Sequence, residues 1–428
     1  MKIERDQVQD VTLNRDIGFF GSAFLSFNGV VGAGIFALPA ALYLQFGDFS
    51  PWLFPLFGLL VLIVAVPFAR VAANHPVSGG PVVYAGAFGP AASFQAGWIY
   101  YVAKLTSLAA NTNVLVAYLA TLWLPIADGF LRAVTILLVV AGITCINVVG
   151  LKRAVKLLDA LTLLKAAPLL FVAILGLVVA ADAIPAPSGL PPLTELETAA
   201  LLILYAFVGF ENSVVPAGET TNPQRTIPRA LIATIIATAA LYFIVQLSYV
   251  AVMEPGEGGD APMVAFGIEL LGPAGGLLLT ATAVFSLLGN ISGGMTATTR
   301  TTYAMGRDGL LPGWFASVSE RFATPVNSVI FMGVLIAFLA LTGSFVWLAV
   351  VSTLARLIVY AISIASLPKT ERPRPMLWLM VVAALAVCGY AALQTAWESW
   401  QMLLILGAAG SVLYLLARLS HRTGKDKI

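Results

Sequence analysis

Charged residues are scarce in this sequence, and residues that form disulfides or bind metal ions are scarcer still. Asp, Glu, Lys and Arg make up 10% of the 428 residues, beside two cysteines and two histidines. Cys145 and Cys388 lie in separate apolar segments, and His75 and His421 lie in a loop and near the end of the chain. We therefore expect neither a disulfide framework nor a metal site.

The sequence also lacks the motifs of nucleotide-binding and nucleic-acid-binding proteins. It contains no Gly-Lys-Ser/Thr loop that would cradle phosphates, which argues against ATP as the energy source of this chain alone. The formal net charge of +2 is close to neutral and indicates no nucleic-acid partner. We expect no cofactor.

Apolar residues dominate what is present. Hydrophobic residues make up 59% of the chain and the mean hydropathy is +0.93, as in integral membrane proteins. Residues 1–16 are polar and lack the apolar core and cleavage site of a secretory leader, so we expect no cleaved leader. Because apolar runs recur from Ile17 onward, the sequence predicts a single, all-α membrane domain.

Twelve apolar segments are long enough to cross a bilayer, which takes about 20 residues. The third and the eighth exceed one crossing and should include part of a loop or an interfacial helix. The predicted spans are 17–46, 52–72, 81–123, 129–149, 154–181, 197–221, 227–253, 268–301, 326–342, 344–366, 375–393 and 398–418.

The distribution of Lys and Arg predicts the orientation, because short cytoplasmic loops retain positive charge. With both termini inside, nineteen of the twenty-three basic residues lie on the cytoplasmic side, while the opposite loops carry mostly Asp and Glu. We therefore expect a multi-pass protein of the cell (inner or plasma) membrane. The N-terminal segment 1–16 and the tail 419–428 would lie in the cytoplasm.

Two predicted spans contain residues that interrupt helices. The first includes GVVGAGIFALPA, from Gly29 to Ala40, and the sixth includes YAFVGFENSVVPAGE, from Tyr205 to Glu219. Closely spaced glycines weaken a helix, and Pro216 removes a backbone donor. Small residues also allow helices to pack closely, which is the alternative reading of the first segment. The presence of a matched second break favours two discontinuous helices.

The positions of these breaks, first and sixth, suggest two inverted repeats of five helices. Transporters of this design place interrupted helices at corresponding points near the middle of the bilayer. The predicted boundaries are 17–181 for the first repeat, 197–366 for the second and 375–418 for two peripheral helices.

Five segments resemble the amino acid–polyamine–organocation family of permeases, in matching order and spacing. The resemblance implies a twelve-helix fold of the leucine-transporter type that moves amino acids or related amines by alternating access. The segments are GVVGAGIFALPA, HPVSGGPVVYAGAFGPAASFQAGW, INVVGLKRAVKLLDALTLLK, FVGFENSVVPAGETTNPQRTIPRA and TTRTTYAMGRDGLLPGWFASVSERFATPVNSVI.

In that family the carboxylate of the substrate binds at the break in the first helix, a motif matched here by Gly32, Ala33 and Gly34. Free N–H groups at the start of a helix favour an anion there. Relatives often carry Ser or Thr at the middle position, whereas Ala33 offers no hydroxyl, so the backbone alone should hold the carboxylate.

The resemblance also assigns the sixth span and two neighbouring helices to the substrate pocket. Backbone carbonyls in the sixth span would accept the ammonium group, and an aromatic ring would close over the substrate. The carbonyl candidates are Tyr205, Ala206 and Val208, and the gate is Phe207 or Tyr205. Further pocket candidates are Asn111 in the third span and Phe285, Asn290 and Met295 in the eighth.

Two charged residues within the spans match functional residues of the family. Glu211 would couple proton movement or link the gates, unless it makes only a constant hydrogen bond to neighbouring helices. Lys165 matches a lysine that replaces a sodium ion in relatives and would bind carbonyls around Gly29 to Val31. Alternatively, its side chain reaches the cytoplasmic interface.

Three further charged residues are candidates for coupling or gating. Lys104 would contact substrate, pair with an acid such as Glu211, or lie near the outer interface, and Arg356 would make a structural or gating contact. Glu219 would latch the closed gate by pairing with Arg225 or Arg229.

These features predict a secondary transporter of amino acids rather than an enzyme. Transport would be independent of sodium and either coupled to protons or exchanging. The alternative within the family is a polyamine or amine carrier. A channel or an intramembrane enzyme is disfavoured, because neither a charge-lined pore nor a nucleophile–base pair is evident.

Overall fold

The computed structural model describes residues 15–77, 79–150, 154–186, 189–372 and 374–425. Most of the predicted cytoplasmic segment 1–16 lies outside these ranges, as does the end of the predicted tail. Several of the basic residues used to predict the orientation also lie outside them: Lys2, Arg5, Lys152, Arg153 and Lys427.

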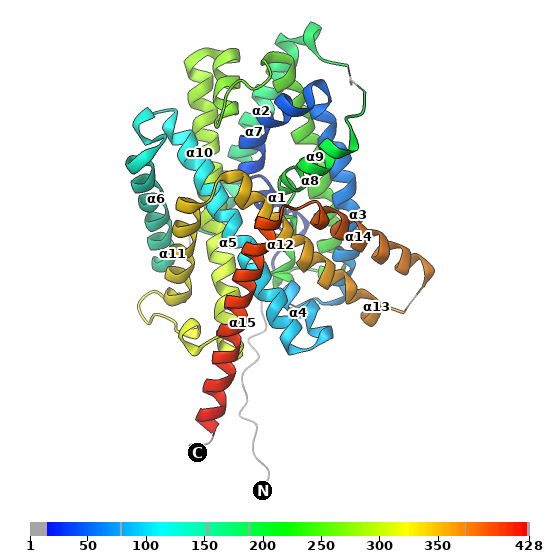
Figure 1. The fold of residues 1–428 in the computed structure, drawn as a ribbon, viewed down its shortest axis with the longest axis vertical. Helices are drawn as coiled ribbons and strands as arrows, with labels where there is room; N and C mark the ends of the chain where they lie inside the picture. The colour runs from blue at the N-terminus through cyan, green and yellow to red at the C-terminus, as the bar shows by residue number, and fades with distance from the viewer. Residues whose placement is uncertain (1–14, 78, 151–153, 187–188, 373, 426–428) are drawn as a thin grey trace.

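The described residues form an all-helical bundle, as the sequence predicts (Figure 1). Helix α1 lies in its interior, with α6 and α11 at one side and α13 and α14 at the other. The α-helices are α1 Phe19–Val30, α2 Ala33–Phe46, α3 Leu53–Asn74, α4 Pro81–Ala85, α5 Pro90–Ala120, α6 Gly129–Val149, α7 Ala154–Val179, α8 Leu193–Tyr205, α9 Pro223–Val252, α10 Pro262–Arg307, α11 Val326–Thr342, α12 Phe345–Ala365, α13 Leu367–Thr370, α14 Pro375–Leu393 and α15 Trp397–Lys425.

Seven helical segments of the described chain are long and apolar enough to cross a membrane. Shorter apolar helices, α1 and α11 among them, supplement these segments. The predicted first span is divided into two helices, α1 and α2. In the predicted sixth span, helix α8 has only 13 residues. The segments are Ala33–Asn74, Gly129–Val149, Pro223–Val252, Pro262–Arg307, Phe345–Thr370, Pro375–Leu393 and Trp397–Leu419.

Helix α5 forms the centre of the core. Every residue from Tyr100 to Val116 is buried, so this helix contacts protein on all sides. Helix α12 packs along it and contributes a buried stretch from Val351 to Leu357. The polar side chains of α5 therefore face other helices rather than lipid.

Both predicted helix interruptions are present. Between α1 and α2, Val31 (ψ 89°) and Gly32 (φ −135°, ψ −142°) leave the helical conformation. After α8 the chain makes turns, and short 3₁₀ segments follow at Phe210–Val214 and Ala217–Glu219. The chain thus loses regular α-helix in both the first and the sixth predicted spans.

The two interrupted segments cross in direct backbone contact. Gly209 adopts φ +113°, a left-handed conformation that favours glycine. A Cβ atom at Gly209 would lie 2.3 Å from the carbonyl oxygen of Gly29. A Cβ atom at Gly34 would lie 2.9 Å from Cα of Ala206. Glycine is therefore required where the segments meet.

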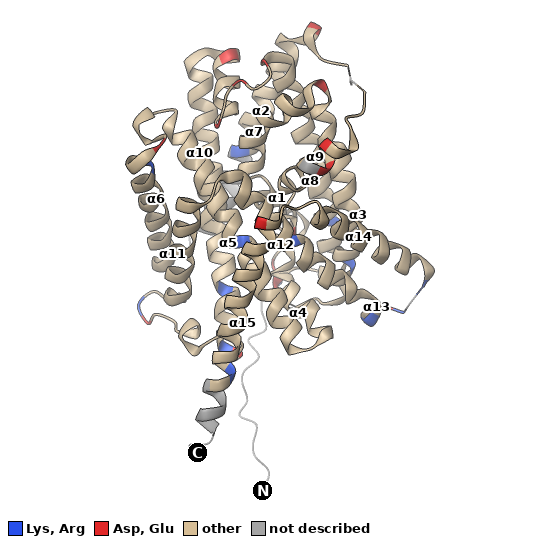
Figure 2. Cartoon of the chain, in the orientation of Figure 1, with Lys and Arg blue, Asp and Glu red and all other residues tan. Residues whose placement is uncertain are grey.

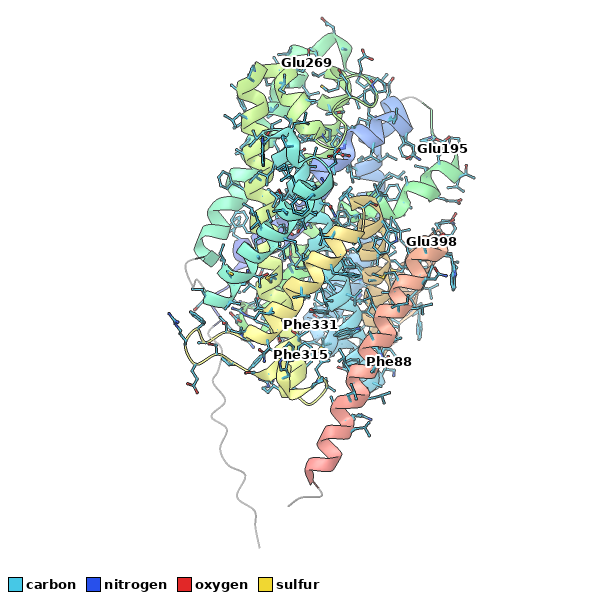
Figure 3. All side chains as sticks on the ribbon, turned by 60° about the vertical axis from the view of Figure 1, so that its left-hand side comes forward. Phe88, Glu195, Glu269, Phe315, Phe331 and Glu398 are labelled. Carbon is cyan, nitrogen blue, oxygen red and sulfur yellow. The ribbon has the colours of Figure 1, made fainter. Side chains whose placement is uncertain are left out.

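Charged side chains are distributed unevenly along the bundle. Figure 2 shows Asp and Glu mainly toward the end that holds the connection between α9 and α10, and Lys and Arg mainly toward the other end. In Figure 3, Glu195 and Glu269 lie toward the first end, whereas Phe88, Phe315 and Phe331 lie toward the second. The bundle therefore has an acidic end and a basic end. This separation agrees with the one expected from the charges of the predicted loops.

Candidate functional site

The end of α1 supplies backbone carbonyls that have no partner within the helix. Asn290 of α10 donates from Nδ2 to the carbonyls of Asn28 (2.9 Å) and Gly29 (3.2 Å). Tyr242 of α9 donates its hydroxyl to the carbonyl of Val30 (3.2 Å). Polar side chains from two other helices thus converge on the first interruption.

Lys165 of α7 also lies at this interruption. Its Nζ donates to the carbonyls of Asn28 (3.2 Å) and Val31 (3.1 Å), and to the Asn28 side chain. Ser286 of α10 donates to the same Val31 carbonyl (3.4 Å). Since Lys165 is only 2% exposed, its side chain does not extend to the interface. The ammonium group therefore lies between α1 and α10, among oxygens at the first interruption.

The first N–H group of α2 faces the carboxamide of Asn111. Ala33 N donates to Asn111 Oδ1 (3.1 Å), and the Tyr205 hydroxyl donates to the same oxygen (3.3 Å). Asn111 Nδ2 in turn donates to Asn290 Oδ1 (2.8 Å). These contacts join the start of α2, the end of α8, α5 and α10 at one buried point.

Glu211 lies in the second interrupted segment and is fully buried. Its Oε1 accepts from Lys104 Nζ and Arg356 Nε, both at 3.1 Å. Its Oε2 accepts from the Tyr360 hydroxyl (2.8 Å) and from the backbone N–H of Gly209 (2.9 Å). Four donors therefore surround the carboxylate and compensate for its burial.

The two cations that bind Glu211 anchor it to α5 and α12. Lys104 also donates to Asn212 Oδ1 (2.5 Å), and Arg356 Nη1 donates to the Ala103 carbonyl (3.1 Å) and the Ser352 hydroxyl. This group has two positive charges and one negative charge. Within the described ranges, no cluster of three or more His, Cys, Asp or Glu side chains is placed to hold a metal ion.

The predicted aromatic gate has two different candidates in the structure. Tyr205 points its hydroxyl at Asn111 and packs its ring against Phe345 (centroids 5.8 Å apart). Phe207 is buried against Phe54 of α3 and Tyr242 of α9, and Tyr242 donates to the Val30 carbonyl at the first interruption. Of the two rings, Tyr205 is the one that bonds Asn111 at the start of α2.

The backbone carbonyls of Tyr205, Ala206 and Val208 are the predicted acceptors of an ammonium group. Ala206 lies directly against Gly34 of α2, and Val208 directs its N–H to the Tyr205 carbonyl (3.2 Å). The Tyr205 carbonyl therefore already accepts one hydrogen bond, from Val208 N–H in this turn.

Two predicted contacts are not formed. Phe285 is 52% exposed on α10 and does not face the residues around the breaks, because the buried face of this helix carries Ser286 and Asn290 contacts instead. The ion pair expected for Glu219 is absent from the described part of the chain, where Arg225 and Arg229 are both exposed. The Glu219 carbonyl instead accepts from Ile17 N (3.0 Å).

Asn113 and Met295 also lie away from the contacts at the breaks. Asn113 bonds the Gly343 carbonyl (3.0 Å) and accepts from Arg132 (3.0 Å). Met295 is fully buried in the apolar core.

Sequence reasoning did not name Asn28, Tyr242, Ser286 or Tyr360 as residues of the site. Tyr360 follows Arg356 by four positions, so that both lie on one face of α12, and this spacing was the available signal. Asn28 directly precedes the glycine-rich motif, and Tyr242 and Ser286 lie within apolar spans. Their polarity within apolar spans marked them, but nothing in the sequence named their partners.

Comparison with known proteins identifies the family. Residues 17–414 match the family described as amino acid permease. The chain belongs to this family. The permease is 30% identical over 406 residues to an uncharacterized transporter of Mycobacterium tuberculosis, covering 89% of this chain and 86% of the relative. It is 27% identical over 316 residues to a cadaverine/lysine antiporter of Escherichia coli, covering 72% and 70%.

The fold of the permease resembles that of a solved structure. The crystal structure of MhsT in complex with L-phenylalanine matches with a TM-score of 0.63 and 14% identity, over 92% of this chain and 99% of that one. The names of the family and of its relatives indicate a transporter rather than an enzyme. With its several membrane-spanning helices, the permease is a multi-pass membrane protein.

Proposed function

We propose that this permease is a secondary active transporter that carries amino acids by alternating access. The observation that supports the proposal most directly is the start of α2, where Ala33 N–H meets an oxygen acceptor inside the bundle. Gly32, Ala33 and Gly34 would present backbone donors to a carboxylate at this point. Tyr205 would close over the substrate, and the second interrupted segment would accept the ammonium group through Ala206 and Val208.

The charge of the site favours amino acids over polyamines. A dication needs acids in the pocket, but Glu211 already accepts from Lys104, Arg356, Tyr360 and Gly209. Lys165 adds another buried positive charge nearby. A zwitterion brings its own carboxylate and fits this electrostatic balance better than cadaverine does.

An amine exchanger of the same family is the second candidate. The relative named a cadaverine/lysine antiporter supports it, since that name covers both an amine and an amino acid. Exchange of two substrates would also use the same alternating site. The two candidates differ in whether the substrate must carry a carboxylate.

We further propose that transport needs no sodium ion. Lys165 Nζ binds the carbonyls of Asn28 and Val31, between α1 and α10, where it supplies a fixed positive charge. Glu211, with Lys104 and Arg356, would link the second interruption to α5 and α12 and so act in gating. The energy would come from protons or from exchange.

The proposed architecture contains twelve spans with both termini in the cytoplasm. The interrupted pair α1–α2 would form span 1, and α8 with the two 3₁₀ segments would form span 6. Residues 17–181 and 197–366 would be the inverted repeats, and 375–418 the peripheral pair. The acidic and basic ends of the bundle support this orientation (Figure 2).

Counterflow in proteoliposomes tests the proposed function. Vesicles containing the purified permease are loaded with each unlabelled L-amino acid or with cadaverine, and entry of the same labelled compound is followed in sodium-free buffer. We expect a transient overshoot for one or more amino acids and none for cadaverine. Simple equilibration would indicate a channel, chemically altered label an enzyme, and overshoot with cadaverine alone the amine exchanger.

Two variants control this experiment. Gly34→Val should abolish counterflow, because its side chain would collide with Ala206 where α2 meets the second interruption. Ala33→Ser should retain it, because the backbone donors stay in place.

A further inference from the structure

The start of α2 is capped by a residue from another helix. Its N-cap is Gly32, which has no side chain to accept from the first turn. The acceptor for Ala33 N–H is Asn111 Oδ1 of α5, 78 residues away in sequence. Asn111 is 2% exposed, so its carboxamide is committed to this contact within the core.

The orientation of this carboxamide follows from its partners. Oδ1 accepts from both Ala33 N–H and the Tyr205 hydroxyl, while Nδ2 donates to Asn290 Oδ1. Asn290 is held in turn by the carbonyls of Asn28 and Gly29. An oxygen with two donors at a helix N-terminus is also the arrangement that a carboxylate oxygen would adopt there.

We propose that Asn111 Oδ1 takes the position at the start of α2 that a carboxylate oxygen of the substrate would otherwise hold. It accepts the hydrogen bond of Ala33 N–H until the carboxylate of an α-amino acid displaces it. This exchange sets the affinity for the substrate and makes a carboxylate necessary for binding. A carboxylate forms hydrogen bonds roughly twice as strong as a neutral carbonyl does, so it displaces the carboxamide. An amine or an amino acid amide lacks that advantage. The inference rests on the proposed function.

Two substitutions at Asn111 give opposite predictions. Asn111→Ala removes the competitor, so amino acids should bind about tenfold more tightly, or ~1.4 kcal/mol, the scale of one lost internal hydrogen bond. Asn111→Asp places a charged oxygen at the same N–H and should weaken binding by at least as much. Asn113→Ala is the matched control, since Asn113 bonds Gly343 and Arg132 instead.

Binding is measured on the purified full-length permease by thermal shift and by radioligand titration. The probes are the twenty proteinogenic L-amino acids, with L-leucinamide and cadaverine as ligands that lack a carboxylate. We expect the Kd to fall in Asn111→Ala, to rise in Asn111→Asp and to change less than about twofold in the control. Asn111→Ser, whose hydroxyl is too short to reach α2, repeats the Ala test if that variant is unstable.

Weaker binding in both Asn111→Ala and Asn111→Asp would show that Asn111 contacts the bound substrate, and would overturn the inference alone. Equal affinity in all variants would do the same. A wild-type protein that neither binds nor exchanges any amino acid would instead overturn the proposed function. Tight binding of L-leucinamide by the wild type would also contradict the inference, because a ligand without a carboxylate would then displace the Asn111 carboxamide.

Discussion

At the scale of single residues, the Glu211 carboxylate holds together parts of the chain that are far apart in sequence. Lys104 and Arg356 both bind its Oε1, while Tyr360 and Gly209 bind its Oε2. Removing one partner of a buried ion pair leaves an uncompensated charge and typically costs about 3–5 kcal/mol. Because this group holds an excess positive charge, its members should not be equally sensitive to substitution.

We expect Glu211→Gln to destabilise the permease far more than Lys104→Met does. The first change leaves two buried cations without an anion, whereas the second leaves a balanced pair of Arg356 and Glu211. Thermal unfolding of the purified variants in detergent measures the difference.

Arg70→Met is the control for this comparison. It removes a partly exposed ion pair with Glu371, which should contribute about 0–1 kcal/mol. If Lys104→Met destabilised the permease as much as Glu211→Gln does, charge balance would not govern the stability of the cluster around Glu211.

The residues of this site differ in how far the sequence could predict them. Glu211, Lys104 and Arg356 are conspicuous as charges in apolar spans, so each could be selected in advance. Their common contact could not, because α5, the second interruption and α12 meet only through tertiary packing. Phe285 shows the opposite failure: an aromatic residue at helical spacing carries no mark of the face on which it lies, and this one is exposed.

At the scale of helices, the interruptions were predictable because their causes are local. Gly and Pro change the backbone where they stand, and the structure loses helix at Val31–Gly32 and after Tyr205. The contact between the two interruptions is not local, since it depends on how α1 and the sixth span cross. Gly209 and Gly29 show that the crossing leaves no room for a side chain.

Gly209→Ala should therefore abolish transport and lower the yield of folded protein. The new Cβ would meet the Gly29 carbonyl oxygen at 2.3 Å, and φ +113° strains any residue other than glycine. Uptake and size-exclusion profiles are the measurements. Gly142→Ala in α6 is the control, because nothing lies within 4 Å of the added atom and alanine favours a helix. Normal uptake by Gly209→Ala would refute the tight crossing.

The contact between α7 and α1 predicts how transport responds to sodium. Lys165 Nζ already binds the Asn28 and Val31 carbonyls, so replacing sodium by choline in the buffer should leave uptake unchanged. Lys165→Met should lose at least about tenfold in uptake, because those carbonyls lose their charged donor. An absolute need for sodium in the wild type would count against this role.

At the scale of the whole molecule, the fold could be predicted further than the site. Composition indicated an all-α membrane protein, and the order of the motifs indicated the family that the comparison establishes. Helix lengths were less predictable: α10 runs for 46 residues across a kink at Gly272, and α8 stops after 13. Packing and local backbone geometry, rather than hydropathy alone, set these lengths.

The acidic and basic ends predict the orientation in the membrane. In a background with Cys145→Ser and Cys388→Ala, we expect Glu257→Cys, between α9 and α10, to react with an impermeant maleimide added to intact cells. Arg321→Cys, between α10 and α11, should react only after the cells are opened. The reverse pattern would mean that the basic end faces outward, contrary to the usual retention of positive charge in the cytoplasm.

The charge excess around Glu211 also has an electrical consequence. Lys104 and Arg356 outnumber the one acid they bind, so this part of the core carries a net positive charge within a membrane protein. One elementary charge moved through a potential of 100 mV exchanges about 2.3 kcal/mol with the field. Any shift of α5 and α12 along the membrane normal during the cycle therefore does work against, or draws work from, the resting voltage. The rate of transport would then follow the membrane potential even when the substrate itself carries no net charge.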